Sequence, residues 1–253
     1  MSLSSREGKT LSVEAEHKVT YNQAMETKQR TQLFIGAAFI VLIIGITVVL
    51  AAMSGSAKPI TGKTSIQTTP VSSSDHVRGN ASSSVSVIEY GDFECPACGA
   101  YEPIMQKLTQ TYGDRVAFVF RQFPLYQIHP NAIISAQASE AASLQGKFWA
   151  MHDALYSNQD AWSTVSTDTV VKDKFDTYAQ SIGLDVAKFN TDVVSQSIVA
   201  NVQSQLSQGE SINIDHTPTF FINGVEIDNP ASADAFSKLI DAALAAATSA
   251  PKQ

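Results

Sequence analysis

The chain has only two cysteines in 253 residues, Cys95 and Cys98, and they are separated by Pro96 and Ala97. A disulfide that closes so small a ring removes little entropy from the unfolded chain, so stability is a poor reason for the pair. A structural zinc site usually has four ligands, and the sequence has neither a second Cys-x-x-Cys nor histidines at ligand spacing. The spacing therefore favours reversible thiol–disulfide chemistry.

Such chemistry needs a thiolate, because the ionised sulfur is the nucleophile. Cys95 follows a short apolar run and directly precedes residues 96–111, whose apolar spacing predicts a helix. The unpaired backbone N–H groups and the dipole at a helix N-terminus favour negative charge. Pro96 suits the first helical turn, where its missing N–H costs no hydrogen bond. We therefore expect Cys95 to be the reactive thiol and Cys98, further along the helix, to be the more buried resolving thiol.

The elements that must position this pair follow an α/β order. An apolar strand over 85–90, the helix and a second strand over 116–120 predict a parallel crossover. Near the end of the chain, Asn223-Gly224 between two apolar runs predicts a hairpin. Other segments have helical periodicity: 133–142, 148–156, 170–182, 193–206 ending before Gly209, and 233–246. This order predicts an α/β sheet with a helical insertion at about 127–210.

Two segments resemble one known family. Residues 87–98 read VIEYGDFECPAC and resemble the active-site segment of the DsbA-like branch of the thioredoxin superfamily. Residues 216–224 read HTPTFFING and resemble the proline loop and hairpin of that family. The resemblance extends over about 85–247, and two motifs about 120 residues apart are more specific than either alone. It implies a thioredoxin-like fold with a helical insertion.

The resemblance also implies a role for each matching residue. Cys95 is the attacking and attacked sulfur, and Cys98 is its buried partner. Pro218 has a cis peptide bond that faces the cysteine pair. The backbone of Thr217 can then bind an extended substrate beside Pro96. The alternative is that Pro218 is an ordinary proline at a strand edge. Glu89 exchanges a proton with Cys98, unless it is a surface residue.

One departure from the family concerns the residue between the cysteines. Strongly oxidising members often carry His there, whereas this chain has Ala97. The histidines 129 and 216 are candidate bases, although partly exposed loop residues are the simpler interpretation. Trp162 and Tyr126 are candidates for lining a groove, with core packing as the alternative.

A membrane anchor is predicted upstream. Residues 33–53 contain no charged side chain, and as a helix they rise about 31 Å at about 1.5 Å each, which matches a bilayer's hydrocarbon core. The alternatives are a buried soluble helix and a cleaved signal peptide, but the run is long for a signal sequence and 32 residues precede it. Flanking basic residues, three before and two after, favour a cytoplasmic segment 1–32. The Ser/Thr-rich residues 54–84 are predicted to be a flexible linker to the domain 85–253.

Charge excludes some functions. Residues 85–253 contain 9 Lys and Arg against 19 Asp and Glu, a net charge of −10. An acidic domain lacks the basic surface that binds nucleic acid.

Together these patterns predict a membrane-anchored thiol–disulfide oxidoreductase that introduces disulfides into secreted or surface proteins outside the cytoplasm. It is expected to need no metal and no cofactor beyond its redox-active disulfide. The resemblance implies reoxidation by a quinone-linked membrane protein, DsbB-like or VKOR-like. The alternatives are a disulfide reductase or isomerase, and a non-catalytic metal-binding or substrate-binding module on the same fold.

Overall fold

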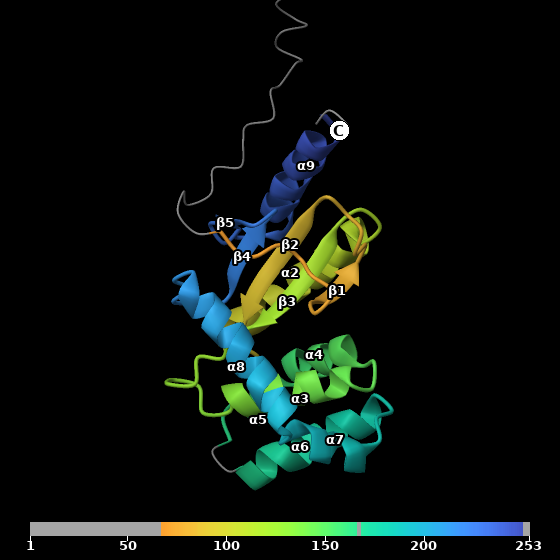
Figure 1. Ribbon diagram of the computed structural model, residues 1–253, viewed down its shortest axis with the longest axis vertical. Helices are drawn as coiled ribbons and strands as arrows, with labels where there is room; N and C mark the ends of the chain where they lie inside the picture. Colours follow the sequence, from red (N-terminus) through yellow and green to blue (C-terminus); the bar gives the residue numbers. More distant parts are fainter. Residues whose placement is uncertain (1–66, 166–167, 250–253) are drawn as a thin grey trace, which may run out of the picture. The chain divides into compact units, whose positions relative to one another are not determined.

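A five-stranded sheet organises the described part of the chain, residues 67–165 and 168–249, in this computed structural model (Figure 1). The strands are β1 His76–Gly79, β2 Ser86–Gly91, β3 Ala117–Gln122, β4 Thr219–Ile222 and β5 Val225–Ile227. Their spatial order is β1-β3-β2-β4-β5. Strands β2 and β3 are parallel, as the crossover predicts, and every other neighbouring pair is antiparallel.

The two faces of the sheet carry separate cores because side chains alternate along each strand. Val87 points to the face covered by α2 Pro96–Tyr112 and α9 Ala233–Ser249. Ile88 and Tyr90 point to the opposite face, where α8 Gln196–Ser211 packs. Between β4 and β5, Asn223 and Gly224 both have positive φ, as a tight hairpin turn requires.

A helical insertion separates β3 from β4 and lies beside one end of the sheet (Figure 1). It has its own core, in which Trp162, Met151 and Leu155 are fully buried. Both cysteines also belong to that core, so they lie where the sheet region meets the insertion. The inserted helices are α3 Ala132–Ser143, α4 Phe148–Ser157, α5 Gln159–Trp162, α6 Asp168–Ser181, α7 Val186–Val193 and α8. The predicted α/β fold with a helical insertion is confirmed.

The last inserted helices differ from the prediction. The expected helix 193–206 is confirmed over 196–206, but its bounds are wrong: α7 ends at Val193, a break follows, and α8 continues through Gly209. Gly209 lies within α8 and does not end it; its small size allows α8 to pack closely against Phe123. A Cβ at Gly209 would lie 2.5 Å from Cδ2 of Phe123, so only glycine lets α8 approach the end of β3 this closely.

The predicted linker 54–84 is also wrong for its described part. Residues 67–84 are folded, and β1 lies within them, paired antiparallel with β3. The preceding residues, 67–75, which we call the strap, cross the sheet face that α8 covers, and Gln67 makes an isolated bridge with Val225. The folded region therefore begins before residue 85.

A buried arginine holds the strap in place. Arg121 of β3 is 5% exposed, and its guanidinium donates to both carboxylate oxygens of Asp75, at 2.8 and 2.9 Å. It also donates to Thr68 Oγ1 at 2.7 Å and to Tyr90 OH at 3.1 Å. Burial raises the pKa of Asp75, but the hydrogen bonds and charge of Arg121 outweigh it and hold that pKa below its ordinary value.

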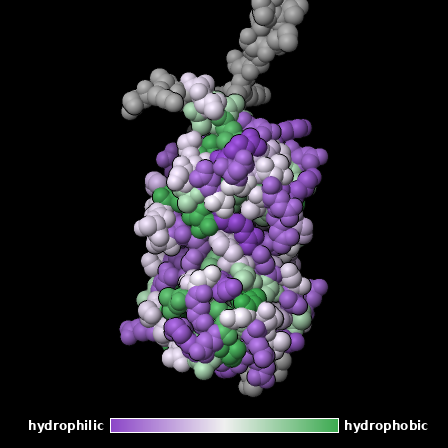
Figure 2. Space-filling model, turned by 90° about the vertical axis from the view of Figure 1, so that its right-hand side faces the viewer, coloured by the Kyte–Doolittle hydropathy of each residue, from purple (hydrophilic) through white to green (hydrophobic). Residues whose placement is uncertain are grey.

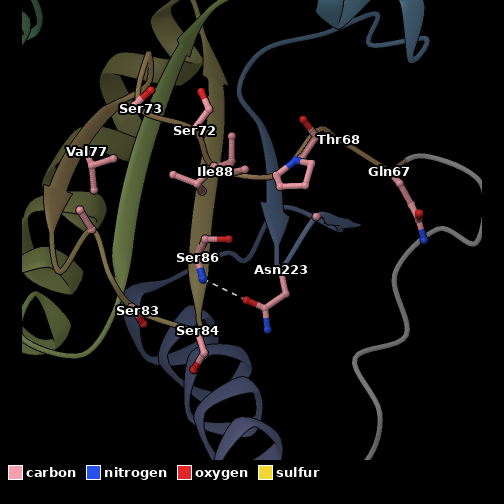
Figure 3. Close-up of a pocket in the computed structure, with 14 residues that line it drawn as sticks. Gln67, Thr68, Ser72, Ser73, Val77, Ser83, Ser84, Ser86, Ile88 and Asn223 are labelled. Atoms are coloured by element: carbon pink, nitrogen blue, oxygen red, sulfur yellow. Dashed lines mark hydrogen bonds between the residues drawn. The ribbon is translucent and has the colours of Figure 1, made fainter. Parts of the chain in front are cut away.

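A groove of about 780 Å³ lies between the strap and the start of β2 (Figure 3). Its lining combines serines with apolar side chains, among them Val71, Val77 and Ile88. Ser86 N donates to Asn223 Oδ1 at 2.9 Å beside it. Because Ser86 begins β2 and Cys95 follows the end of β2, this groove and the cysteines lie at opposite ends of the strand.

No helix within residues 67–165 and 168–249 has the length and apolar character to cross a bilayer. The predicted cytoplasmic segment 1–32, the anchor 33–53 and the linker part 54–66 lie outside the described residues.

On the face that Figure 2 shows, hydrophobic residues form small separate groups among hydrophilic ones.

We expect the strap to depend on its ion pair. Replacing Arg121 by Met leaves the Asp75 carboxylate buried without its partner, a change that costs about 3–5 kcal/mol of unfolding free energy. Chemical denaturation measures it. The control is Lys172→Met on α6, since the exposed i,i+4 pair of Lys172 with Asp176 contributes only about 0.3–0.5 kcal/mol. Equal losses in the two variants would contradict the anchoring role.

Candidate active site

Cys95 lies at the N-terminus of α2, where the sequence places it. It is the residue before the first turn, with φ −68° and ψ 120°, and Pro96 starts the helix. Its N–H donates to the carbonyl of Asp92 at 3.1 Å, which closes the turn between β2 and α2. Cys95 is 7% exposed and Cys98 is 1% exposed, and both are free thiols. Cys98 is thus the more deeply buried of the two.

A distant loop completes the surroundings of Cys95. The Thr217–Pro218 peptide bond is cis, and Sγ of Cys95 lies 3.5 Å from the carbonyl oxygen of Thr217. These residues are 122 positions apart. They meet because β2 and β4 are antiparallel neighbours, with Tyr90 opposite Thr219. The end of β2 that leads to Cys95 therefore lies beside the start of β4, which follows Pro218.

The two thiols have opposite acidities. The thiol of Cys98 donates a hydrogen bond to Cys95. Together with the side chain of Thr217 and the backbone N–H groups of Cys98 and Ala97, this contact outweighs the opposing effect of burial and lowers the pKa of Cys95 to about 5. Burial, and then the hydrogen bond to Cys95, raises the pKa of Cys98 well above its ordinary value. At neutral pH Cys95 is a thiolate and Cys98 holds a proton.

Glu89 is buried beside this pair. It is 5% exposed, which excludes the surface alternative, and it lies on the face of β2 that α2 covers. Burial raises its pKa well above the ordinary value, and the charges of Glu102 and Cys95 raise it further. Its charge in turn raises the pKa of Cys98. A carboxyl whose pKa is raised can exchange a proton with a thiol whose own pKa is raised.

Some residues around the pair carry no signal that the sequence analysis used. Asp92 is 1% exposed; its carboxylate accepts from Glu94 N at 2.8 Å and from Leu125 N at 2.9 Å, and it lies 2.7 Å from His129 Nδ1. Gln159 Nε2 donates to the carbonyls of Phe93 and Cys95, at 2.8 and 2.9 Å. Asp92 and Gln159 therefore fix the turn that carries Cys95. The position of Asp92, three residues before Cys95, was a usable signal; Gln159 meets the turn only through tertiary packing.

The remaining candidates do not join the cysteines. His129 is half-buried against Asp92, and His216 is exposed and lies 2.8 Å from Asp215. Trp162 is fully buried, with Nε1 donating to the Leu155 carbonyl at 2.9 Å. Tyr126 is 49% exposed, so core packing is the wrong interpretation for it.

One group of side chains within the described residues has the spacing of metal ligands. One ligand atom each from Glu102, His152 and Asp153 lies within 4.8 Å of the others. The Arg78 guanidinium, however, already donates to the Asp153 carboxylate at 2.7 Å. A cation therefore already compensates Asp153, which makes the group a poor site for a metal ion.

Comparison with known proteins identifies relatives of this arrangement. A family model described as thioredoxin matches residues 72–242. The Na(+)/H(+) antiporter NhaA 1 of Mycolicibacterium vanbaalenii is 36% identical over 172 residues, which are 66% of this chain and 26% of that protein. NhaA 3 of Salinispora tropica is 35% identical over 178 residues, 70% of this chain and 26% of that protein. The chain spans about a quarter of the length of these curated relatives.

Solved structures share the fold. BdbD from Bacillus subtilis superposes with a TM-score of 0.63 at 22% identity, covering 72% of this chain and 100% of BdbD. Alpha-DsbA1 from Wolbachia pipientis superposes with a TM-score of 0.61 at 21% identity, covering 71% and 94%. At these identities the likeness establishes the fold alone.

The acidity of Cys95 can be titrated. The ultraviolet absorbance of the thiolate in the reduced protein should appear as pH rises through about 5. The pKa of Cys95 in the folded protein lies below the ordinary value of 9.0, so ionisation of Cys95 stabilises the reduced fold. This stabilisation is complete above about pH 9 and is lost as the pH falls to about 5. Cys98→Ala should raise the midpoint, because it removes the largest lowering contact, whereas Cys98→Ser keeps a hydroxyl donor. Equal midpoints in the two variants would contradict the role of Cys98.

Proposed function

Since the chain belongs to the thioredoxin family and has the fold of DsbA-like proteins, we propose that it is a thiol–disulfide oxidoreductase whose redox pair is Cys95 and Cys98. The observation that carries the proposal is the opposite acidity of two adjacent thiols, one at a helix N-terminus and one buried behind it. A structural or metal-holding pair has no need of that difference. The match covers about a quarter of each antiporter, so antiporter activity is not proposed for this chain.

The reaction follows from this asymmetry. In the oxidised enzyme, a substrate thiolate attacks Sγ of Cys95, the bond between the two cysteines breaks, and Cys98 leaves as a thiolate that takes a proton. A second substrate thiolate then attacks its partner sulfur in the mixed disulfide and releases Cys95 as a thiolate. Two electrons pass from the substrate dithiol to the enzyme. Cys95 is suited to the second step, in which it leaves, because a thiol of low pKa is a good leaving group.

The cis-proline loop binds the substrate chain in this proposal. Thr217 is buried next to Sγ of Cys95, and Pro218 has no N–H that competes for a hydrogen bond. An extended substrate can therefore pair with the Thr217 backbone while its cysteine faces Cys95. Pro96 is exposed at the helix start, where it borders the same approach.

Glu89 is the proposed proton donor and acceptor for Cys98. When the disulfide opens, the buried Cys98 thiolate is strongly disfavoured, and protonated Glu89 supplies the proton. When the disulfide re-forms, the proton returns to Glu89 before Cys98 attacks. This role needs a carboxyl of raised pKa, which its burial provides.

The proposed direction is substrate oxidation. An ionised Cys95 stabilises the reduced enzyme, and stabilising the reduced form makes a disulfide more oxidising. The helix N-terminus and the Cys98 thiol provide this stabilisation although Ala97 supplies no histidine. A reductase or isomerase acting on the same kind of substrate is the alternative.

The proposed location is the outer side of a membrane. The uncharged segment 33–53 supports a single-pass anchor with residues 1–32 in the cytoplasm, and disulfides persist mainly outside the cytosol. The substrates are then reduced secreted or surface proteins. The enzyme needs an acceptor for two electrons, and a quinone-linked membrane oxidase of the DsbB-like or VKOR-like kind would supply it.

Substitution at Cys95 tests the proposed activity. Cys95→Ser should abolish oxidation of a dithiol peptide, because serine forms no disulfide. Cys98→Ala, mixed instead with the disulfide form of the peptide, should accumulate a mixed disulfide, because Cys95 attacks the peptide disulfide and no Cys98 is present to resolve it. Ala100→Ser, an exposed change on the same helix, is the control and should oxidise normally. Retained oxidation in Cys95→Ser would refute the assignment.

The reduction potential tests the direction. Equilibration with glutathione buffers should give a potential well above the value of about −270 mV for thioredoxin. A potential near that value would contradict the oxidase direction and favour a reductase.

A further inference from the structure

A small cavity lies between the sheet and helices α2 and α4. Its volume is about 20 Å³, and its lining includes Glu89 from β2, Glu102 from α2, His152 from α4 and Arg78 from β1, beside apolar side chains such as Met105 and Phe120. A cavity of this size with several polar groups in its wall has room for one water molecule. Two acidic side chains and an imidazole thus meet at one site in the interior.

The cavity matters because Cys98 and Glu89 are both cut off from solvent. They are 1% and 5% exposed, yet each turn of the proposed reaction takes one proton up at this pair and later releases one. A proton exchanged inside a buried site needs a series of donor and acceptor groups to reach bulk water. The mechanism described so far supplies none beyond Glu89.

Glu102 is the first group that can continue such a series. It follows Cys98 by four residues on α2, so the two side chains lie on the same face of the helix. Glu102 is 6% exposed, and burial raises its pKa. Its Oε1 accepts from Gln106 at 3.0 Å, while Oε2 lies 4.0 Å from Nε2 of His152. That gap is longer than a hydrogen bond, so transfer needs a small movement of the carboxyl or a bridging water.

His152 connects the interior to the surface. It is 3% exposed, and its Nε2 faces Glu102, while its Nδ1 lies 3.0 Å from Oδ1 of Asp153. An imidazole can accept a proton on one nitrogen and release one from the other. The Asp153 side chain is 41% exposed. The ring is held by edge contacts with Phe120 and Trp149, both at 4.9 Å between ring centroids.

We propose that the proton exchanged between Cys98 and Glu89 reaches solvent through Glu102, His152 and Asp153, with one water in the cavity linking the two glutamates. This proposal rests on the proposed redox function and adds three positioning residues to it. When the disulfide opens, Glu89 protonates the Cys98 thiolate and is reprotonated from solvent along this route. When the disulfide forms, the Cys98 proton passes to Glu89 and leaves in the opposite direction, so protons and electrons balance in both half-reactions.

The charges around the route suit proton passage. Arg78 of β1 neutralises Asp153 at the outer end, and its guanidinium lies 4.3 Å from the centre of the Trp149 ring. Tyr156 of α4 is buried near Cys98, Glu89, Glu102 and Asp92; burial, and then their charges, raise its pKa, so it stays neutral. Arg78 lines the same cavity as Glu89 and Glu102, and its charge opposes the effect of burial on the pKa of Glu102.

The test uses the full 253-residue chain and follows two steps in one rapid-mixing experiment. Reduced protein is mixed with excess glutathione disulfide: Cys95 attacks first and releases one glutathione, and then Cys98 loses its proton, attacks the mixed disulfide and releases the second. Acid quenching and mass spectrometry follow the mixed disulfide, because the second glutathione thiolate takes up the proton that Cys98 gives and the net change in pH is small. His152→Gln and Glu102→Gln should slow the second step about tenfold at neutral pH and leave the first step unchanged. The effect is smaller than the roughly 10²–10⁴-fold of a direct general acid or base, because these residues act through Glu89.

Three controls separate a proton route from a structural role. Glu102→Asp keeps a carboxyl and should restore most of the rate that Glu102→Gln loses. Glu140→Gln, on α3, changes another buried carboxyl with a histidine partner, His76 at 2.9 Å, and should leave both steps within about twofold of the unchanged chain. The reduction potential and the thiolate titration of Cys95 should stay the same in His152→Gln.

The outcomes are distinguishable. An unchanged second step in His152→Gln and Glu102→Gln overturns the route, and so does a slower step accompanied by a shifted potential, which would indicate altered packing or charge. If the unchanged chain itself fails to release glutathione from Cys95, the proposed redox function fails instead.

Discussion

The antiparallel pairing of β2 with β4 is the constraint on which the site depends. It fixes Tyr90 opposite Thr219, and so brings the end of one strand beside the start of another that is more than a hundred residues away in the sequence. Cys95 continues from β2 and Pro218 precedes β4. A slip of one residue in this register would move the proline loop along the strand and turn each side chain of β4 to the other face. The contact between Cys95 and Thr217 is therefore set by backbone hydrogen bonds of the sheet.

Burial acts on that geometry to create chemical asymmetry. Two identical side chains one helical turn apart have pKa values displaced in opposite directions, because Cys95 meets N–H and S–H donors at the helix start and Cys98 faces an apolar core. The same burial raises the pKa of Glu89. Desolvation, which usually opposes the placement of ionisable groups in an interior, here sets the order in which the groups of the site ionise.

Much of this arrangement could be predicted from sequence because local patterns specify it. The spacing of Cys95 and Cys98, the crossover and the Asn223-Gly224 turn each depend on residues close together in the chain. The break between α7 and α8 also had a local signal. Asp185 accepts from Lys188 N at the start of α7, and Ser195 accepts from Ile198 N at the start of α8, both as N-terminal caps.

Other features depend on distant partners and left no periodic pattern. The strap is held by Arg121, Asp75 and Thr68, a polar contact across 46 to 53 positions, so its Ser/Thr-rich composition looked like a linker. Gly209 resembled a helix end, because its contact with Phe123 exists only in the folded chain. Glu102 and His152 meet only when α4 packs against α2, and neither carries a motif.

The position of the strap has a consequence for orientation. The described chain joins the sheet at Gln67, which pairs with Val225 beside the hairpin turn and the start of β2. Cys95 follows the far end of β2, about 20 Å away for a six-residue strand at about 3.3 Å per residue. The described chain thus enters the fold at the end of β2 opposite its reactive sulfur. Under the proposed anchoring, a tether that enters there leaves the other end of the strand, which carries Cys95, accessible to the proposed protein substrates.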